Sequence, residues 1–212
     1  MEERHIPVRR TARYHTLGEA ASAKEIWIVL HGYGQLARYF LSAFEGLEGD
    51  RLIVAPEGLS RFYTDNTFTR VAASWMTRED RDEEIADQVA YLDELVRALR
   101  RECPTNATLH VLGFSQGVAT ATRWAYRTST PLKQIVLWGG SIPPELDADV
   151  LRKHWSTWRI DLVHGTEDTV VNEEKLLQNE AKLRAAGLKW DTHRFPGGHA
   201  LDPVILRRII GG

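Results

Sequence analysis

Gly113-Phe114-Ser115-Gln116-Gly117 is the stretch that decides the fold of this chain. It matches the pattern G-x-S-x-G, and it lies between an apolar run at residues 109–112 and a helical pattern at residues 116–126. A serine between a strand and a helix in this pattern stands on a sharp turn that exposes its hydroxyl at the edge of a sheet. Because a serine hydroxyl is a weak nucleophile until a base lies beside it, the turn predicts Ser115 as a nucleophile with a base nearby.

Strand and helix patterns alternate on both sides of this turn. The expected strands are residues 26–30, 52–55, 109–112, 135–138, 160–163 and 190–195, with one or two more within 5–17. The expected helices are residues 36–44, 81–101 and 116–126, one that follows an N-cap at Asn172 and ends at Gly187, and one that follows Asp202. Alternation of this kind predicts an α/β fold, with a mostly parallel sheet covered by helices on both faces, in one domain over residues 1–212. Residues 59–80 have no clean period and are expected to form a long loop with room for a short helix, whose role stays open.

Composition excludes several classes of protein. In 212 residues, 43% hydrophobic and 26% charged side chains are typical of a folded globular domain. The 27 basic and 29 acidic residues leave a net charge of -2, which does not favour nucleic-acid binding. The single cysteine, Cys103, cannot form an intrachain disulfide, and the apolar run 26–30 is too short to span a bilayer. The charged N-terminus has no signal-peptide pattern, so we expect a cytoplasmic protein without stable membrane association.

Two further segments complete a catalytic pattern. Asp168 ends the sequence Gly165-Thr166-Glu167-Asp168 directly after the strand 160–163, and His199 ends Pro196-Gly197-Gly198-His199 after the last strand. Sites in α/β sheets lie at the carboxyl ends of strands, and the order Ser, Asp, His is that of α/β-hydrolases. We therefore expect Asp168 to orient His199, the base for Ser115. Its neighbour Glu167 is expected to point outward, and the rival base His193 lies inside a strand, where a structural role is expected.

A fourth segment, His31-Gly32-Tyr33-Gly34-Gln35, follows the strand 26–30. Acyl transfer places negative charge on the carbonyl oxygen, which preorganised N–H groups must stabilise. We assign these oxyanion donors to the backbone N–H groups of Tyr33 and Gln116. The imidazole of His31 is expected to brace the loop.

Two alternatives compete with this interpretation. The same loop, from Gly32 through Gly34 to Ala37, also reads G-x-G-x-x-A, and Glu57 follows at the distance of a ribose-binding acid, which would suit a dinucleotide-binding oxidoreductase. That interpretation leaves Ser115, Asp168 and His199 unexplained. The second alternative is a binding protein of the hydrolase fold without activity. No histidine spacing suggests a metal site, and neither a cofactor nor a metal is expected.

The four segments together resemble the phospholipase/carboxylesterase family, which includes acyl-protein thioesterases, and the resemblance covers nearly the whole chain. It implies hydrolysis of carboxylic ester or thioester bonds without a cofactor, in a compact domain without a large cap. Two departures leave the subfamily open. Gln35 stands where many members have Asp, and Trp75-Met76-Thr77 stands where Trp-Phe-Asp is usual.

Substrate choice is harder to derive from the sequence. Trp75, Phe114 and Trp138, together with the ring of Tyr33, lie beside the expected site loops and are predicted to line an apolar acyl pocket. An open site of this kind suits a small-molecule ester or thioester with a short to medium acyl group. The physiological substrate, the choice between ester, thioester and lysophospholipid, and the oligomeric state stay open.

Overall fold

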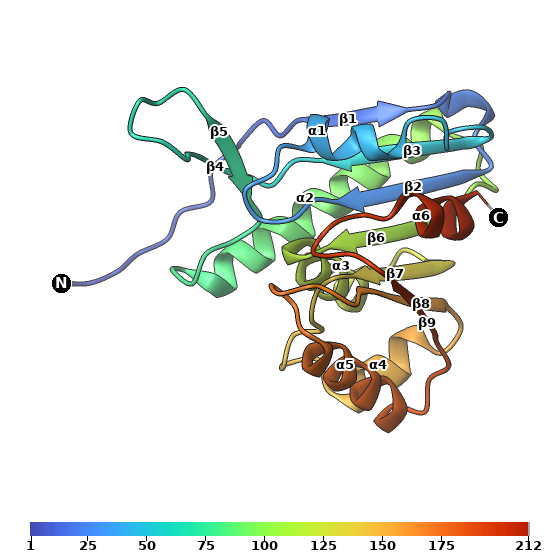
Figure 1. Cartoon of the computed structure of the whole chain (residues 1–212). Coiled ribbons are helices and arrows are strands. Elements are labelled where there is room, and N and C mark those ends of the chain that lie inside the picture. Colours follow the sequence, from blue (N-terminus) through green and yellow to red (C-terminus); the bar gives the residue numbers. More distant parts are fainter. Residues whose placement is uncertain (212) are drawn as a thin grey trace.

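A seven-stranded sheet with helices on both faces forms the body of the molecule in the computed structural model, which describes residues 1–211 (Figure 1). Its strands are β1 (Tyr14–Leu17), β2 (Glu25–Leu30), β3 (Arg51–Pro56), β6 (Thr108–Phe114), β7 (Gln134–Trp138), β8 (Arg159–Gly165) and β9 (Asp191–Phe195). They lie in the order β1-β3-β2-β6-β7-β8-β9, and every neighbouring pair is parallel except β1 with β3. The predicted α/β fold with a mostly parallel sheet is confirmed.

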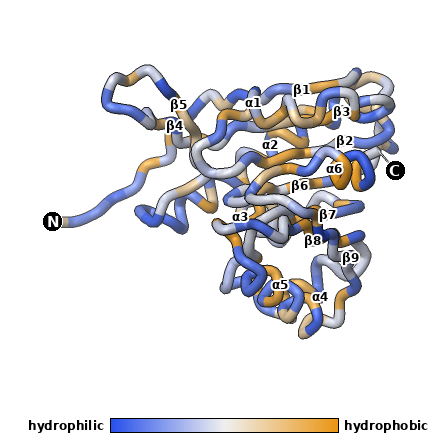
Figure 2. Tube along the Cα trace, viewed as in Figure 1, coloured by the Kyte–Doolittle hydropathy of each residue, from blue (hydrophilic) through white to orange (hydrophobic). Residues whose placement is uncertain are grey.

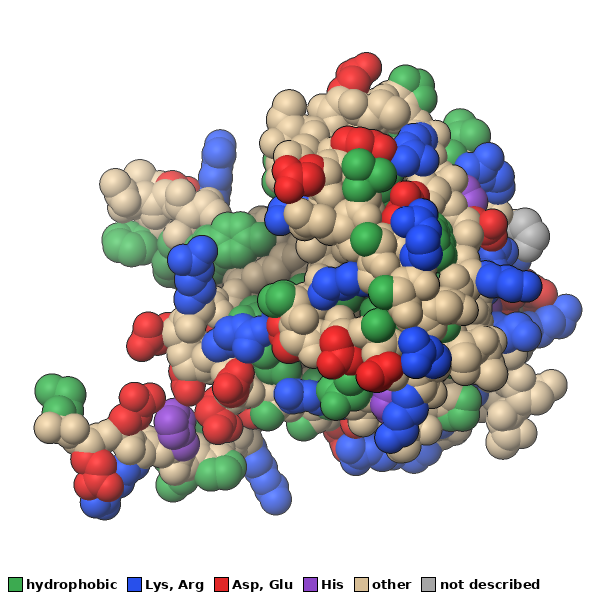
Figure 3. Space-filling view, turned by 90° about the horizontal axis from the view of Figure 1, so that it is seen from below, with side chains coloured by type: hydrophobic (Ala, Val, Ile, Leu, Met, Phe, Trp, Pro, Cys, Tyr) green, Lys and Arg blue, Asp and Glu red, His purple; other side chains and the backbone are tan. Residues whose placement is uncertain are grey.

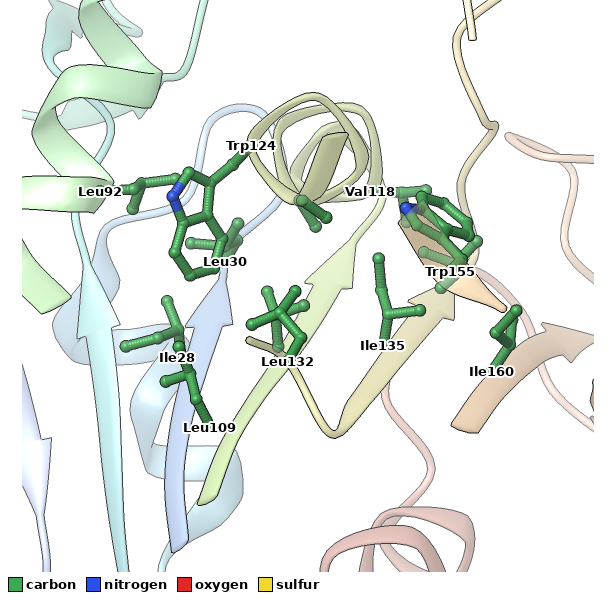
Figure 4. Close-up of a cluster of buried hydrophobic side chains, with 14 of the residues drawn as sticks. Ile28, Leu30, Leu92, Leu109, Val118, Trp124, Leu132, Ile135, Trp155 and Ile160 are labelled. Carbon is green, nitrogen blue, oxygen red and sulfur yellow. The ribbon is translucent and has the colours of Figure 1, made fainter. Parts of the chain in front are cut away.

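The helices divide between the two faces of the sheet. They are α1 (Ala37–Leu41), α2 (Arg81–Glu102), α3 (Gln116–Arg127), α4 (Ala148–Trp155), α5 (Glu173–Ala185) and α6 (Pro203–Ile210), with short 3₁₀ turns at Ala20–Ser22 and Ser42–Phe44. Side chains of α2, α3, α4 and α5 share one buried cluster, and those of α1 and α6 share the other. Figure 4 shows Val118 and Trp124 of α3 pointing onto the strands in the first cluster.

The strands are apolar on both faces because both faces are covered. Along β2, Ile26, Ile28 and Leu30 belong to the first cluster, whereas Trp27 and Val29 belong to the second. Successive side chains of a strand point to opposite faces, so a strand buried on both sides must be apolar throughout. Figure 2 shows this concentration of hydrophobic residues in the sheet.

Two helices begin at the N-caps that the sequence predicts. Asn172 caps α5 by accepting a hydrogen bond from Lys175 N, and Asp202 caps α6 by accepting from Val204 N and Ile205 N. Helix α4 was not among the predicted elements. Asp147 caps it through the N–H groups of Asp149 and Val150, a signal that the sequence carries but that introduces only eight residues.

The prediction for residues 59–80 was wrong. This region contains a two-stranded antiparallel hairpin, β4 (Ser60–Tyr63) with β5 (Val71–Ser74), which Figure 1 shows beyond the carboxyl ends of β2 and β6. The connecting turn winds around Asp65, whose carboxylate accepts hydrogen bonds from the N–H groups of Thr69, Thr67 and Arg70. Hydrogen bonds from Thr69 N–H first, and from the hydroxyls of Thr69 and Thr67 and the N–H group of Arg70, lower the pKa of Asp65 to about 2. Strands of four residues are too short to show a period, which is why the hairpin was missed.

The prediction of one or two strands within residues 5–17 is confirmed only for β1. Residues 1–13 form an extended arm that carries no strand in the described structure, and Figure 3 shows the N-terminal end of this arm projecting from the body. Acidic and basic side chains are interspersed on the face seen in Figure 3. None of the helices described over residues 1–211 has both the length and the apolar character needed to cross a bilayer.

Glu57, directly after β3, joins the arm and the hairpin to the sheet. Its side chain is fully buried and accepts hydrogen bonds from Arg13 Nε (2.8 Å), Arg61 Nε (2.6 Å) and Ala37 N (3.3 Å). Burial alone would raise the pKa of Glu57, but the guanidinium groups of Arg13 and Arg61 outweigh it and hold the pKa below its usual value. The folded state therefore favours the carboxylate.

Replacing this carboxylate by an amide is expected to destabilise the protein. Glu57→Gln should lower the free energy of unfolding by about 1–3 kcal/mol at pH 7, because two guanidinium groups lose their counter-charge. Since the folded pKa lies below the unfolded value of about 4.3, the stabilisation is present above that value and is lost as the pH falls through the folded pKa. The difference in the free energy of unfolding between wild type and Glu57→Gln, measured by urea unfolding, should be smaller below pH 4 than at pH 7. The exposed Glu45→Gln is the control, and an equal loss in it would contradict the assignment.

Candidate active site

Ser115 stands on the turn between β6 and α3, in a backbone conformation that few residues adopt. Its φ and ψ angles are 55° and -117°, which costs a residue with a side chain on the order of 1–3 kcal/mol. The turn is held by hydrogen bonds from Ser115 N to Trp138 O (2.9 Å) and from Val118 N to Ser115 O (3.0 Å). The hydroxyl is thereby lifted to the carboxyl edge of the sheet, as the sequence pattern predicts.

The two glycines of the turn are required by backbone packing. A Cβ on Gly117 would lie 2.2 Å from Leu30 O, and one on Gly113 would lie 2.4 Å from Gly117 O. Helix α3 therefore begins in direct backbone contact with β2. This contact places the start of α3 beside the loop that follows β2.

The structure brings Ser115, His199 and Asp168 into one hydrogen-bonded chain. Ser115 Oγ lies 2.8 Å from His199 Nε2, and His199 Nδ1 lies 2.7 Å from Asp168 Oδ2. The ring of His199 packs against the ring of Phe114, with centroids 4.9 Å apart, and the side chain is 18% exposed. This arrangement can pass a proton from the hydroxyl to the imidazole while the carboxylate holds the ring in place.

Asp168 is built to stay ionised. Its side chain is 1% exposed, and its second oxygen, Oδ1, accepts hydrogen bonds from Val170 N and Val171 N, both at 2.8 Å. Burial would raise the pKa of Asp168, but the hydrogen bonds from Val171 N–H, His199 and Val170 N–H outweigh it and lower the pKa. The carboxylate therefore faces the Nδ1 position of His199 as an acceptor.

The loops that carry Asp168 and His199 support each other. Thr166 N donates to Phe195 O and Glu167 N donates to Gly197 O, both at 2.9 Å, so the loop after β8 is bonded to the loop after β9. Glu167 is exposed, as predicted. His193, the rival base, lies 2.8 Å from the buried Asp161 through its Nε2, in the structural role expected of it.

The loop after β2 lies against the serine. A Cβ on Gly32 would lie 3.2 Å from Ser115 Cβ, so Gly32 packs against the nucleophile, and Tyr33 is the residue that follows Gly32 in the loop. Within residues 1–211, the N–H groups of Tyr33 and Gln116 have no hydrogen-bond acceptor. Two free donors from separate segments next to a serine hydroxyl suit a developing oxyanion.

His31 braces this loop, as the sequence suggests. It is fully buried, its Nδ1 lies 2.7 Å from Gly32 O, and its Nε2 lies 3.0 Å from Gly58 N, which donates to it. Burial lowers the pKa of His31, so the neutral imidazole is favoured. A neutral ring accepts from Gly58 N–H while its own Nδ1–H donates to Gly32 O.

Three of the four aromatic residues predicted to line the acyl pocket are buried and offer no open face, and the prediction needs correction for these three. Trp75 and Trp138 are 1% exposed and Phe114 is 5% exposed. Trp75 Nε1 donates to His31 O (2.8 Å) and Trp138 Nε1 donates to Ala200 O (3.0 Å), so both indoles hold loops of the site from behind. Large aromatic rings gain most free energy by full burial, which the sheet and its helices provide here. The ring of Tyr33, the fourth of these residues, is 62% exposed and stacks on Phe62 of the hairpin, with ring centroids 5.3 Å apart.

A cavity of about 790 Å³ lies away from the triad, between the arm and α2. Trp75 forms part of its wall, together with Val8, Tyr91 and Leu95, and no triad residue lines it.

Within the described chain, ligand atoms of the kind that bind metal come together in one exposed group, formed by Glu3, His5 and Asp80. Exposed acidic groups are common without an ion, and none of these residues belongs to the triad.

Sequence reasoning missed the side chains that hold the loop after β2. Gln35 Oε1 accepts a hydrogen bond from Gly32 N at 2.7 Å, and Gln35 forms a bridge with Ala73 of β5. The signal was present in the sequence, since Gln35 stands out at the position where an Asp is usual. The role of Gln35 depends on its contact with the hairpin, a region that the sequence predicts as a loop.

The dinucleotide alternative requires a carboxylate that is free to bind a ribose. Glu57 is fully buried and already bonded to Arg13, Arg61 and Ala37. The geometry therefore does not favour that alternative.

Comparisons with known proteins give the family and the fold. The family model described as phospholipase/carboxylesterase matches residues 16–211. Among solved structures, acyl-protein thioesterase 2 of Zea mays is 21% identical, with a TM-score of 0.73 over 95% of this chain and 97% of that chain. A carboxylesterase from Mesorhizobium loti is 18% identical (TM-score 0.73, 95% of each chain), and the esterase PE8 is 22% identical (TM-score 0.71, 95% of this chain and 97% of that chain). A search of curated proteins gives no match.

Proposed function

The chain belongs to the phospholipase/carboxylesterase family, and from that premise we propose that it hydrolyses carboxylic ester or thioester bonds with Ser115 as nucleophile, His199 as base and Asp168 as orienting acid. The observation that carries the proposal is the hydrogen-bonded chain from Ser115 Oγ through His199 to Asp168, at 2.8 and 2.7 Å. A non-catalytic binding protein would not need these two hydrogen bonds between Ser115, His199 and Asp168.

The first half of the reaction forms an acyl-enzyme. His199 Nε2 takes the proton of Ser115 Oγ as the oxygen attacks the carbonyl carbon of the substrate. The carbonyl oxygen becomes an oxyanion, and the N–H groups of Tyr33 and Gln116 donate to it. When the intermediate collapses, the bond to the alcohol or thiol breaks and His199 returns the proton to that leaving group.

The second half of the reaction releases the acid. His199 removes a proton from water, the resulting hydroxide attacks the acyl carbon, and the same two N–H groups stabilise the second oxyanion. Collapse of this intermediate returns the proton to Ser115 Oγ and frees the carboxylic acid. Throughout, the carboxylate of Asp168 stabilises the imidazolium and keeps the ring oriented.

We expect a substrate with a short to medium acyl group. The buried rings of Trp75, Phe114 and Trp138 leave the acyl chain to lie against exposed surface, where Tyr33 stacked on Phe62 offers an apolar face. A small-molecule ester or thioester fits such an open site, and the proposal requires no cofactor, no nucleic acid and no stable membrane association. The balanced charge and single cysteine favour a cytoplasmic setting.

A fluorophosphonate probe read by intact mass tests the proposal directly. The wild-type protein should gain one adduct, because an activated serine attacks the phosphorus, and Ser115→Ala should gain none. A p-nitrophenyl ester series of increasing chain length then measures the acyl preference. If the folded wild-type protein gains no adduct, the proposed function is wrong.

A further inference from the structure

Two separate segments supply the two N–H groups assigned to the oxyanion, and a third segment contacts both. Tyr33 lies on the loop after β2, and Gln116 begins α3. The third segment consists of residues 73–76, the end of β5 and the two residues that follow it. Because this segment is bonded to both sides, it can set how far apart the two donors lie.

The first side of the contact is the loop after β2. Gly34 N donates to Ala73 O at 2.9 Å, and Gln35 forms a bridge with Ala73. Trp75 Nε1 donates to His31 O at 2.8 Å. Tyr33 therefore lies between residues that are each bonded to the 73–76 segment.

The second side of the contact is the side-chain amide of Gln116. Its Oε1 accepts from Trp75 N at 3.1 Å, and its Nε2 donates to Met76 O at 2.9 Å and to Ser74 Oγ at 3.1 Å. Both atoms of the amide are thus committed to the 73–76 segment. Ser74 and Trp75 are 1% exposed, so little water competes for these bonds.

The 73–76 segment is itself fixed from behind. The buried Gln88 of α2 donates through Nε2 to Trp75 O, and Thr120 of α3 donates to Gln88 Oε1 at 3.2 Å. On the other side, β5 pairs with β4, with Ser74 opposite Ser60. A segment held from both sides can transmit position from one donor to the other.

We propose that Gln116 is a positioning residue for the oxyanion site as well as one of its two donors. Its side-chain amide, acting through the 73–76 segment, fixes the separation between its own N–H group and that of Tyr33. An oxyanion site works only when its donors lie within 2.7–3.1 Å of the oxygen that becomes charged, so a small change in their separation weakens the transition state more than the bound substrate. The inference rests on the proposed function.

Gln116→Met is the variant that tests it. Methionine has a similar length and keeps the backbone N–H group, but it makes none of the amide's hydrogen bonds. We expect kcat to fall about 10–100-fold while KM stays within about threefold of the wild-type value. Misplaced donors destabilise the transition state much more than the bound substrate. Affinity for an alkyl trifluoromethyl ketone should fall by a similar factor. In that complex Ser115 Oγ adds to the ketone carbon, the proton passes to His199, and the ketone oxygen becomes the oxyanion.

Gln134→Met is the matched control. Gln134 is also a buried glutamine, bonded to His110 and Asp161, but it lies at the start of β7, at the opposite edge of the sheet from Ser115. The control is expected to lose stability on urea unfolding while kcat and ketone affinity stay at the wild-type level. Comparing the two variants distinguishes an effect of lost packing from an effect of a misplaced oxyanion donor.

Each remaining outcome decides the inference. Wild-type kcat and ketone affinity in Gln116→Met would overturn it, and so would a loss of stability with unchanged ketone affinity, which would mean a structural role only. If wild type reacts with the fluorophosphonate and Gln116→Met matches it in kcat, the inference alone fails. If wild type forms no adduct, the proposed function fails and the inference falls with it.

Discussion

Replacement of Ser115 by alanine is expected to lower kcat for a p-nitrophenyl ester by on the order of 10⁴-fold or more. The variant loses the oxygen that attacks the carbonyl carbon of the substrate in the first half of the proposed reaction, while the N–H groups of Tyr33 and Gln116 and the His199–Asp168 pair remain. Residual turnover would come from water at the oxyanion donors. Initial-rate kinetics over a range of substrate concentrations measure the loss, and KM should change far less than kcat.

The fold should survive this substitution. Ser115 has a φ of 55°, where alanine is strained as serine is, and the glycine contacts on both sides of the turn are unchanged. Urea unfolding should therefore give a free energy within about 1 kcal/mol of wild type. Near wild-type kcat in a folded Ser115→Ala would remove Ser115 from the mechanism.

The second large effect is expected at Asp168. Asp168→Asn should lower kcat by on the order of 10³–10⁴-fold, with a smaller change in KM. The asparagine oxygen can still accept from Val170 N and Val171 N, where Oδ1 lies now, which turns the NH₂ group toward His199 Nδ1. The ring must then accept at Nδ1 and carry its proton on Nε2, the wrong tautomer for taking the proton of Ser115.

Its neighbour in sequence provides the control. Glu167 is exposed and outside the hydrogen-bonded chain, so Glu167→Gln should keep kcat within about twofold of wild type. Kinetics at pH 7–8 on both variants, with unfolding curves to establish that both are folded, complete the comparison. Less than a tenfold loss in Asp168→Asn would show that another group orients His199.

Much of this molecule could be predicted from local sequence alone. The run around Ile28 is apolar at every position because helices cover both faces of β2, and G-x-S-x-G has glycines where backbone atoms lie 2.2 and 2.4 Å from a would-be Cβ. Asn172 and Asp202 mark helix starts because a cap bonds to N–H groups only two or three residues away. The capping partners are close in sequence, and the apolar run and the glycines answer to close packing in general, so each of these signals can be recognised in the local sequence.

Other features depended on partners that are distant in sequence. The hairpin of Ser60–Tyr63 with Val71–Ser74 has strands too short for a period and becomes visible only through its pairing. Trp75 follows β5 and Trp138 ends β7, near positions where site residues lie, yet both rings are buried, and loop carbonyls at His31 and Ala200 accept from their indoles. No local pattern distinguishes an aromatic ring that lines a pocket from one that supports it from behind.

The sequence by itself determined the α/β class, the sharp turn at Ser115 and the order of the three candidate catalytic residues, because these follow from periodicity, backbone sterics and the position of loops after strands. Only the tertiary structure decided that His199 Nε2 lies 2.8 Å from Ser115 Oγ, that Glu57 is buried among arginines, and that residues 73–76 join the two oxyanion segments. Apart from the pair of Arg61 with Glu57, these contacts join residues 39 to 84 positions apart, and their energies depend on distances of a few ångströms that folding of the whole chain sets.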